Sequence, residues 1–415
     1  MIARRVAALL VGGTLVAGAL AGCGDDPAWF EIAHVESSEP QAEPTPEATD
    51  AGAAAVRALA TRHDGWTAAG GADVVWSPLA TARALAMVRA GATGELAGAL
   101  DEVLGDGGVD AVGAVGEAVR RDAGTTSTSD GTTAEVELGD ATAVWGPSGQ
   151  TWAPGYLDAL ARSFGASAWT VDVAHDPARA ATELDAWAAA RVGGEPGDLV
   201  SAKALADDDR LLVTSALSLA APWATPASLG TLPFTSGDGA TADVDVVVAD
   251  GTFDVRRGDG WQAVSLPLAG GRFAVTVLLP DDVAEGSGLQ VQLDELLGAL
   301  AEPGEPEPLV VAVPAVDRRS RTDAGPFAEL LGRPGADLVA MTDDPATAPR
   351  QVDGFFGEAV LALGPAGLNV DGGANRGAIL DGIDFAVDRP FALVVHHVAT
   401  GTPLLQALVT DLTSG

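Results

Sequence analysis

The five histidines are the residues of this chain best suited to bind a metal ion or to transfer a proton near neutral pH. They are spread through the sequence as His34, His63, His175, His396 and His397. No two of them have the spacing that would place both imidazoles on one face of a helix. His396 and His397 are adjacent in a strand-like run, where successive side chains point to opposite faces. We therefore interpret them as structural residues and expect no metal site.

Sequence motifs for other kinds of catalysis are also missing. The nearest approach to a nucleophile elbow, Gly146-Pro147-Ser148-Gly149, has the composition of a turn. A phosphate-binding loop needs a lysine after its glycines, and the single lysine, Lys203, lies in another context. The acidic run Asp207–Asp209 could attract a cation but is typical of a solvated turn, and Asp243, Asp245 and Asp250-Gly251 lack the spacing of a calcium loop. The sequence therefore predicts a protein that is not an enzyme and that binds no cofactor.

The composition excludes further classes of function. The 415 residues include 23 basic and 58 acidic side chains, which give a net charge of −35. Nucleic-acid binding requires a basic surface, and anionic lipid head groups repel a protein of this charge. Hydrophobic residues make up 47% of the chain, which is enough for a large buried core. The single cysteine, Cys23, rules out an internal disulfide.

The N-terminus has the three parts of an export signal: the basic start Met1–Arg5, an apolar stretch over 6–19, and small residues before Cys23. The segment Leu20-Ala21-Gly22-Cys23 resembles the end of a bacterial lipoprotein signal. This resemblance implies removal of a signal peptide over 1–22, lipidation of Cys23, and a location outside the cytoplasm, anchored to the membrane. An ordinary secreted protein and an uncleaved anchor are the alternatives, although a spanning helix usually needs about 20 apolar residues.

Residues 23–50 are rich in Pro, Glu, Asp and Ala, so we expect an acidic, flexible tether, with an ordered strand near Trp29–Ile32 as the alternative. Residues 51–413 show no repeat and no polar linker, which indicates one domain. Helices are expected over 53–63, 79–89, 156–164 and 178–191, a loop over 125–131 within the Gly-, Asp-, Ser- and Thr-rich stretch 105–134, and strands over 73–76, 141–145, 210–214, 243–248, 261–267, 273–279, 309–313, 359–363 and 391–395. Helices first and strands later favour an α+β fold.

Several segments occur in an order that resembles the serpin family. The most specific is Asp388-Arg389-Pro390-Phe391, followed by His397 and Thr400-Gly401-Thr402. Weaker matches are Trp76-Ser77-Pro78-Leu79, Gly91-Ala92-Thr93-Gly94-Glu95, Leu184-Asp185-Ala186-Trp187, Val213-Thr214-Ser215-Ala216-Leu217 with Trp223, Leu266-Pro267 and Val313-Pro314. The resemblance covers about 51–413. It implies helices of the first half packed on large mixed β-sheets and an exposed reactive loop at about 364–387.

A serpin resemblance implies inhibition of serine-type endopeptidases by a suicide-substrate mechanism. The protease would cleave the loop and form an acyl-enzyme, and the cleaved loop would insert as a new strand in the large sheet. The hinge matches the family at Gly367 but lacks its alanine run, and it continues as Leu368, Asn369, Val370, Asp371, Gly372, Gly373 and Ala374. Small or apolar residues alternate here with polar ones, which is the period of a strand with one buried face.

The spacing of the loop leaves the cleaved bond open. Counting forward from Gly367 by the family spacing gives Asp381, and counting back from the Pro-Phe motif gives Ile379. A trypsin-like protease would favour Arg376, whereas a subtilisin- or elastase-like protease would accept Ile379 or Leu380. We expect cleavage near Ile379 and Leu380, in a monomeric inhibitor.

Three positions depart from the family pattern. Ser215 replaces the usual Asn of the central strand, Gly357-Glu358-Ala359 replaces His-Lys-Ala, and His396 replaces an Arg. These changes and the missing alanine run favour a second hypothesis, a serpin fold that binds a ligand without inhibiting proteases. A third hypothesis is an unrelated exported hydrolase or solute-binding lipoprotein, which a fold without a large mixed sheet would favour.

Overall fold

The computed structural model describes residues 32–62, 74–128, 131–193, 199–206, 211–281, 287–335, 337–344, 346–370 and 382–412. The chain divides into two compact units, Met1–Glu31 and Ile32–Gly415, and all of the described residues belong to the second unit. Cys23 and the expected signal peptide therefore lie outside the described residues. None of the described helices is long and apolar enough to span a membrane.

Three of the described helices begin where the sequence supplies an N-cap residue followed by proline. Thr45, Ser77 and Asp176 each accept a hydrogen bond from the backbone N–H three residues later, and proline occupies the first helical position. Small and apolar residues on nearly every face of the helix that follows Ser77 allow it to be buried almost all round. The helices are α1 (Pro46–Ala60), α3 (Pro78–Gly91), α4 (Gly94–Leu104), α5 (Gly108–Asp122), α6 (Pro154–Phe164), α7 (Pro177–Val192), α8 (Ser287–Ala299) and α9 (Ala328–Leu331).

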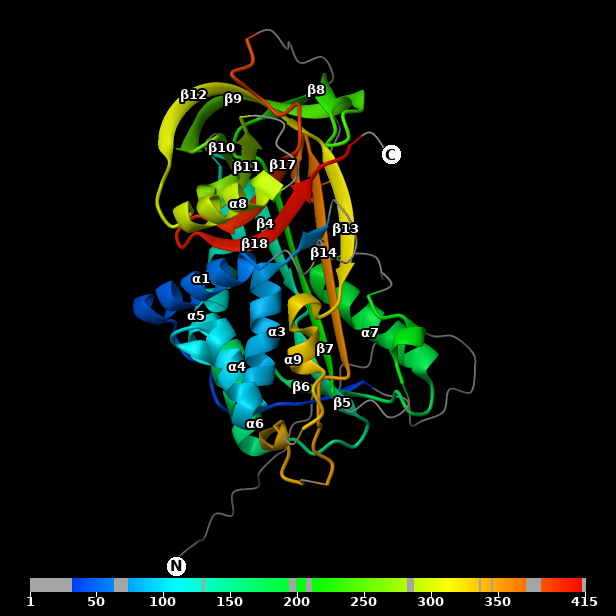
Figure 1. Cartoon of the computed structure of the whole chain (residues 1–415). Coiled ribbons are helices and arrows are strands. Elements are labelled where there is room, and N and C mark those ends of the chain that lie inside the picture. Colours follow the sequence, from blue (N-terminus) through cyan, green and yellow to red (C-terminus); the bar gives the residue numbers. More distant parts are fainter. Residues whose placement is uncertain are drawn as a thin grey trace, which may run out of the picture. The chain divides into compact units, whose positions relative to one another are not determined.

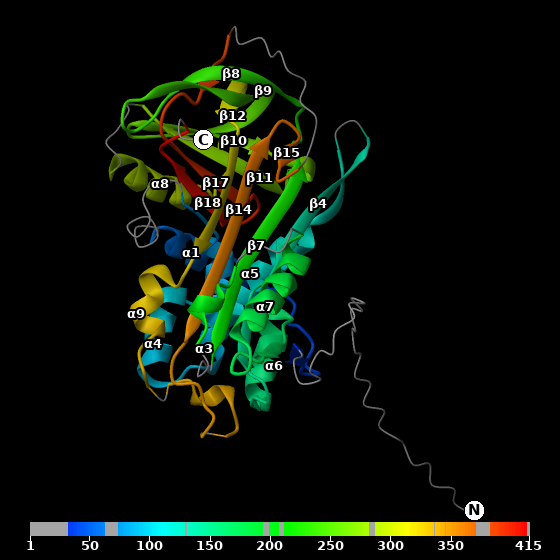
Figure 2. The ribbon, with the colours of Figure 1, turned by 90° about the vertical axis from the view of Figure 1, so that its right-hand side faces the viewer.

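Nine described strands form the first sheet, which contains the start of the expected reactive loop. The main path is β1 (Ala33–Val35), β6 (Ala168–Val171), β5 (Ala143–Pro147), β7 (Leu212–Pro222), β15 (Gly367–Leu368), β14 (Gly354–Gly364) and β13 (Val316–Thr322). In addition, β4 (Thr133–Asp140) pairs with β7, and β3 (Gly124–Ser127) pairs with β4. The long strands β7 and β14 run side by side in parallel (Figure 2).

Nine described strands also form the second sheet. Their order is β16 (Phe385–Ala386), β12 (Glu305–Pro314), β9 (Thr241–Gly258), β10 (Trp261–Pro267), β11 (Phe273–Pro280), β17 (Phe391–His397), β18 (Thr402–Val409) and β2 (Val75–Trp76), with β8 (Ala227–Thr235) paired to β9. Every residue of β11 and β17 is buried, which explains their mostly apolar sequences. In Figure 1 this sheet and α8 occupy the upper part of the view, and α3 to α6 occupy the lower part.

A large apolar cluster joins the helices to both sheets. It includes residues of α1, α3 and α5 and the odd-numbered residues Leu217, Leu219 and Ala221 of β7. Side chains alternate along a strand, so the even-numbered residues of β7 face the other side of the first sheet. There Ser218 donates a hydrogen bond to the Val192 carbonyl at the end of α7, at 2.6 Å. The first sheet therefore has a core face and an α7 face.

The predicted boundary of the tether at residue 50 is wrong. Residues 33–35 already pair with β6, and α1 begins at Pro46. Thr45 and Pro46 are a cap and a first-turn proline, and this start signal lies within a stretch whose acidic, proline-rich composition predicts flexibility.

The loop predicted over 125–131 is also partly wrong, because Gly124–Ser127 form β3, which pairs with β4. The Gly-, Asp-, Ser- and Thr-rich stretch 105–134 also contains α5, whose buried residues Val112, Val115 and Val119 recur at helical spacing. The many glycines and aspartates of the stretch outweigh this short apolar stripe when the sequence is judged by composition alone.

Candidate functional site

The candidate site is the fork of the first sheet, where β7 and β14 separate around β15. Below the fork, Gly354–Ala359 of β14 pair directly with Leu212–Leu217 of β7 in parallel register. Above it, β15 lies between the two strands and is antiparallel to both: Leu368 is opposite Ala221 of β7 and opposite Leu363 of β14. The first residues of the expected reactive loop therefore already form a strand of the sheet.

The register of β7 and β14 is the same on both sides of the fork. The residue numbers of the partners Gly354 and Leu212 differ by 142, and those of Leu363 and Ala221, which face each other across β15, also differ by 142. The two strands therefore need to separate only sideways, by about one strand spacing of 4.8 Å, to admit more of a third strand. No slip along the strands is required.

Glycine is required at the start of β15. A Cβ atom on Gly367 would overlap the Ala221 carbonyl of β7, so only a residue without a side chain fits. The turn before it is held by Trp223, whose Nε1 donates to the Gly364 carbonyl at 2.8 Å. After the glycine, Leu368 is fully buried in the core. Gly367 and Trp223, both matches to the family, thus help to position the chain in the fork.

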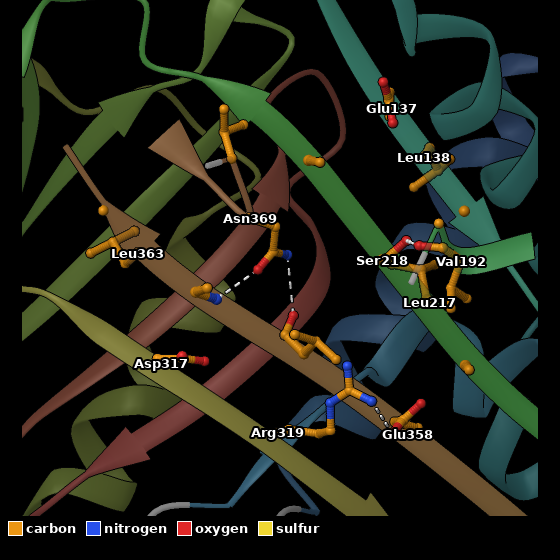
Figure 3. A pocket seen from close by; sticks show the side chains of 18 of the residues that line it. Glu137, Leu138, Val192, Leu217, Ser218, Asp317, Arg319, Glu358, Leu363 and Asn369 are labelled. Carbon is orange, nitrogen blue, oxygen red and sulfur yellow. Dashed lines mark hydrogen bonds and ion pairs between the residues drawn. The ribbon is translucent and has the colours of Figure 1, made fainter. Parts of the chain in front are cut away.

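Asn369 ends β15 and fills the gap of the fork (Figure 3). Its φ of 50° lies in the left-handed region, and among the described residues it alone has a positive φ without being glycine. Its backbone N–H donates to the Ala362 carbonyl, and its Oδ1 accepts from the Ala362 N–H, both at 2.6 Å. Its Nδ2 donates to the Leu219 carbonyl of β7 at 2.9 Å and to the Val360 carbonyl of β14 at 3.3 Å. One side chain therefore bonds to both separated strands.

A cavity of about 740 Å³ lies over the fork on the α7 face of the sheet. Its lining includes Asn369, the last turn of α7 and the ion pair between Arg319 of β13 and Glu358 of β14. Arg319 Nη1 lies 3.2 Å from a Glu358 oxygen, and the Glu358 side chain is only 7% exposed. The cavity thus combines charged walls with a floor formed by β7 and β14 around the fork.

The helix α7 is attached to the first sheet by an aromatic cluster. The ring of Trp187 lies edge-on to Trp145 of β5 and to Trp169 of β6, with centroid distances of 4.7 Å and 5.3 Å. The Arg191 guanidinium lies 4.0 Å from the Trp187 ring centroid and 4.9 Å from that of Trp169. A cation over aromatic faces is attracted by the ring quadrupoles. Arg191 therefore strengthens the contact of α7 with the sheet beside the cavity.

The departure at Gly357-Glu358-Ala359 is explained by the neighbouring strand β13. A Cβ atom on Gly357 would overlap Thr322 Oγ1, so a side chain there would require Thr322 to move. Glu358, in the next position, forms the ion pair with Arg319. This part of the first sheet is therefore joined by a charge pair across β13 and β14 rather than by the family's histidine.

The third departure, His396, is part of a buried hydrogen-bond chain in the second sheet. Its Nε2 lies 2.9 Å from Thr276 Oγ1, which lies 2.7 Å from Ser265 Oγ. Ser265 Oγ accepts in turn from Arg256 at 3.0 Å. Burial lowers the pKa of His396 to about 3, and the positive charge of Arg256 acts in the same direction. His396 is therefore a neutral, structural histidine at physiological pH.

His397 has different partners, as the alternation of side chains along a strand predicts. Its Nε2 lies 2.8 Å from Asp122 at the end of α5, and its Nδ1 lies 2.9 Å from Thr400 Oγ1. Burial lowers its pKa, and the nearby Asp122 carboxylate opposes that effect. The Thr400 carbonyl accepts a hydrogen bond from Arg57 of α1. His397 and the Thr-Gly-Thr turn therefore connect the second sheet to two helices.

Four of the predicted loop residues, Gly367, Leu368, Asn369 and Val370, lie together at the fork. The bonds of Asn369 could not be predicted from the sequence; the available signal was that Asn tolerates the left-handed region better than most residues. Among the described residues, no group of three or more His, Cys, Asp or Glu side chains could hold a metal ion. The other predicted site residues lie outside the described residues: Asp371, Gly372, Gly373, Ala374, Arg376, Ile379, Leu380, Asp381 and Cys23.

Comparisons with known proteins agree with this architecture. Residues 67–412 match the family model described as serpin, or serine protease inhibitor. The rice (Oryza sativa subsp. japonica) protein serpin-Z5 is 26% identical over 394 residues, which cover 83% of this chain and 87% of the relative. The crystal structure of Serpin48 from the insect Tenebrio molitor has a TM-score of 0.72 at 19% identity and covers 87% of this chain and 98% of its own. Arabidopsis AtSerpin1, in its native stressed conformation, has a TM-score of 0.71 at 18% identity and covers 88% and 99%. The α+β fold is therefore confirmed, and the chain belongs to the serpin family.

Proposed function

We propose that this chain inhibits serine-type endopeptidases as a suicide substrate, through cleavage of the loop at about 364–387 and insertion of the cleaved segment into the first sheet. The observation that carries the proposal is β15, because the first loop residues already form a strand between β7 and β14. The match to a family of serine protease inhibitors supports the class of target. The subclass of protease, subtilisin-like or elastase-like, is proposed from the residues Ile379 and Leu380.

The bond-breaking chemistry would belong to the target protease. Its serine oxygen attacks a loop carbonyl carbon, the peptide C–N bond breaks, and the new amino terminus leaves with a proton from the protease's histidine. The resulting ester joins the loop to the protease. Serpins are a standard example of a loop that then adds as a strand to a sheet. The inhibitor needs no catalytic residue for this sequence, so we propose that it is not an enzyme.

The register of β15 would place the alternating residues of the loop on opposite faces of the first sheet. Leu368 is opposite Ala221, so a straight continuation would set Val370 opposite Leu219 and Gly372 opposite Leu217. Leu217, Leu219 and Ala221 all belong to the core cluster. The small or apolar residues of the loop would therefore enter the core, and the polar residues between them would face the α7 side.

Insertion would exchange one parallel pairing for two antiparallel pairings. The strands β7 and β14 now share a parallel ladder of six residue pairs, whereas β15 is antiparallel to both. Parallel pairing is slightly less stable per residue than antiparallel pairing, and a second ladder adds further backbone hydrogen bonds. These terms favour the inserted state and supply a driving force for the mechanism.

Arg376 opposes complete insertion. In the same register it would face Val213 and Phe355, which are partners in the ladder and lie on the core side of the sheet. Burying an unpaired charge costs many kcal/mol, but this pair is next to the last of the ladder, where a long side chain can extend its charge toward water. Cleavage near Ile379 and Leu380 requires Arg376 to enter the sheet, whereas cleavage after Arg376 leaves it at the chain end.

We also propose that the chain is exported as a bacterial lipoprotein. The basic start, the apolar stretch and the segment ending at Cys23 support removal of residues 1–22 and a lipid on Cys23. The inhibitor would then be a monomer outside the cytoplasm, held at the membrane by that lipid, with secretion as the alternative. Since β1 and α1 belong to the folded body, the tether would be shorter than 23–50.

The experiment is to incubate the purified protein with subtilisin-, elastase- and trypsin-like proteases, followed by denaturing electrophoresis and mass spectrometry. We expect a band that resists denaturation at the summed mass of both proteins, and the released peptide locates the cleaved bond. Val370→Arg places a charge on the core face of the inserting strand and should abolish the band while leaving cleavage intact. Its matched control, Asp371→Arg, places the same charge on the opposite face and should retain the band. Cleavage of the wild-type protein without the band, for all three proteases, would favour the non-inhibitory binding protein instead.

A further inference from the structure

Backbone groups of a strand point alternately to its two neighbours, and this rule predicts what Asn369 would do if β15 continued straight. The Asn369 N–H donates to the Ala362 carbonyl, so the polar backbone groups of Asn369 face β14. In a straight strand the Asn369 carbonyl would therefore accept from the Ala362 N–H. The N–H of Val370 would face the other way and donate to the Leu219 carbonyl of β7, which lies opposite Val370 in the register of β15.

The side chain of Asn369 makes these same two bonds. Its Oδ1 accepts from the Ala362 N–H at 2.6 Å, where the Asn369 carbonyl would be. Its Nδ2 donates to the Leu219 carbonyl at 2.9 Å, where the Val370 N–H would be. A carboxamide has the same C=O and N–H groups as a peptide bond. The side chain thus occupies the position of the next peptide group of the strand.

We propose that Asn369 is a cap of the fork, a residue whose side chain substitutes for its own next peptide group and so stops the insertion of β15 after Leu368. This inference rests on the proposed function, because a stop has meaning only for a loop that can insert further. The left-handed φ of 50° turns the backbone out of the sheet while the carboxamide stays in it. For the strand to advance by one residue, Asn369 must change to extended φ and ψ, and the peptide group between Asn369 and Val370 must replace the Asn369 side chain at Ala362 and Leu219.

The chemistry of the site requires an amide rather than another polar group. The Ala362 N–H needs an acceptor, and the Leu219 and Val360 carbonyls both need a donor. An aspartate keeps the acceptor but directs its second oxygen at two carbonyl oxygens. A glycine keeps the left-handed backbone without strain but provides neither group. The two substitutions therefore separate the role of the carboxamide from that of the turn.

Hydrogen exchange of the Ala362 amide tests the cap directly, on the full-length protein without any protease. Mass spectrometry with fragmentation that resolves single amides compares the wild type with Asn369→Gly and Asn369→Asp. In Asn369→Gly we expect exchange at Ala362 to be at least tenfold faster, with the closed ladder at Gly354–Ala359 unchanged. In Asn369→Asp the Ala362 amide should keep most of its protection. The matched control is Asn375→Gly, the same change at the chain's other asparagine, which should leave Ala362 unaffected.

A wild-type exchange rate at Ala362 in Asn369→Gly would overturn the cap, since the amide would then have another partner.

Asn369→Val tests the stop itself, because a β-branched residue strongly disfavours the left-handed region and has no carboxamide. We expect the strand to advance in this variant, with the Val360 and Ala362 amides protected and the melting temperature raised. A lower melting temperature together with fast exchange at the Val360 and Ala362 amides would also refute the stop. Neither readout depends on inhibition, so a failure to form protease complexes would refute the proposed function and leave the cap standing.

Discussion

The buried histidine of the second sheet predicts a specific loss of stability in mild acid. Burial lowers the pKa of His396 from 6.5 to about 3 in the folded protein, and the charge of Arg256 adds to this effect. Between these two values the unfolded chain binds a proton that the folded chain does not, so the free energy of unfolding falls as the pH decreases. Above pH 6.5 the low pKa of His396 does not reduce the free energy of unfolding. Below pH 6.5 it reduces that free energy by about 1.4 kcal/mol per pH unit, down to pH 3. Between pH 7 and pH 5 the loss is therefore about 2 kcal/mol.

The hydrogen bonds of His396 explain why protonation of its ring is so unfavourable in the folded protein. Arg256 can only donate, so Ser265 accepts from it and can pass its own hydrogen to Thr276. With that orientation Thr276 donates to Nε2 of His396, which is then the unprotonated nitrogen. Among the described residues, the other nitrogen, Nδ1, is buried without a partner. A proton on Nε2 would break this chain, and Arg256 would repel the resulting positive charge.

The assay is urea unfolding of the wild type, His396→Gln and His34→Gln at pH 7 and at pH 5. His34 is exposed, so its replacement is a matched control for the chemical change. We expect the wild type and His34→Gln to lose about 2 kcal/mol more than His396→Gln does on acidification. His397, whose pKa burial also lowers, titrates in all three proteins and cancels in the comparison. Equal losses in the wild type and His396→Gln would refute the reasoning.

Three further substitutions test the contacts around the fork. Gly367→Ala should lower the free energy of unfolding by about 1–3 kcal/mol through overlap with β7, measured by urea unfolding. Arg191→Gln should cost about 1 kcal/mol and change the fluorescence of Trp187, because it removes the cation over that ring. Arg319→Ala leaves the buried Glu358 carboxylate without its partner and should cost about 1–3 kcal/mol, whereas the double variant with Glu358→Gln should recover most of that loss. A single Arg319→Ala variant as stable as the wild type would mean that water already solvates Glu358.

Much of the fold could be predicted from the sequence because its signals are local. The helix expected over 79–89 is present as α3, which begins at Ser77-Pro78 because the cap and the proline act within one turn. The strand expected over Trp261–Pro267 has the observed bounds, because its apolar run is flanked on both sides by segments with clear turn residues. The order of motifs then indicated how these elements are arranged.

The fork could not be predicted in the same way, because it depends on contacts between distant segments. The bonds of Asn369 join it to Val360 and to Leu219, which is 150 residues away. Nothing in the residues next to Asn369 shows that its side chain will meet two separated strands. The period-two pattern of the loop describes the strand it could become, whereas the left-handed φ of Asn369 interrupts that strand in the observed state. The same residues therefore carry signals for two conformations, and sequence periodicity reveals only one of them.

This difference suggests that the two conformations are separated by kinetics as well as by stability. When the strand advances, the two bonds of the Asn369 carboxamide to Ala362 and Leu219 are replaced one for one by backbone bonds, so the cap itself changes the relative free energy of the end states little. The exchange nevertheless requires both bonds to break and the residue to leave the left-handed region before the new ones form. The end states differ mainly in the ladder below the fork, where six parallel pairs of β7 and β14 would give way to two antiparallel ladders. A cap of this kind therefore acts mainly on the rate of insertion, whereas the ladder determines its direction.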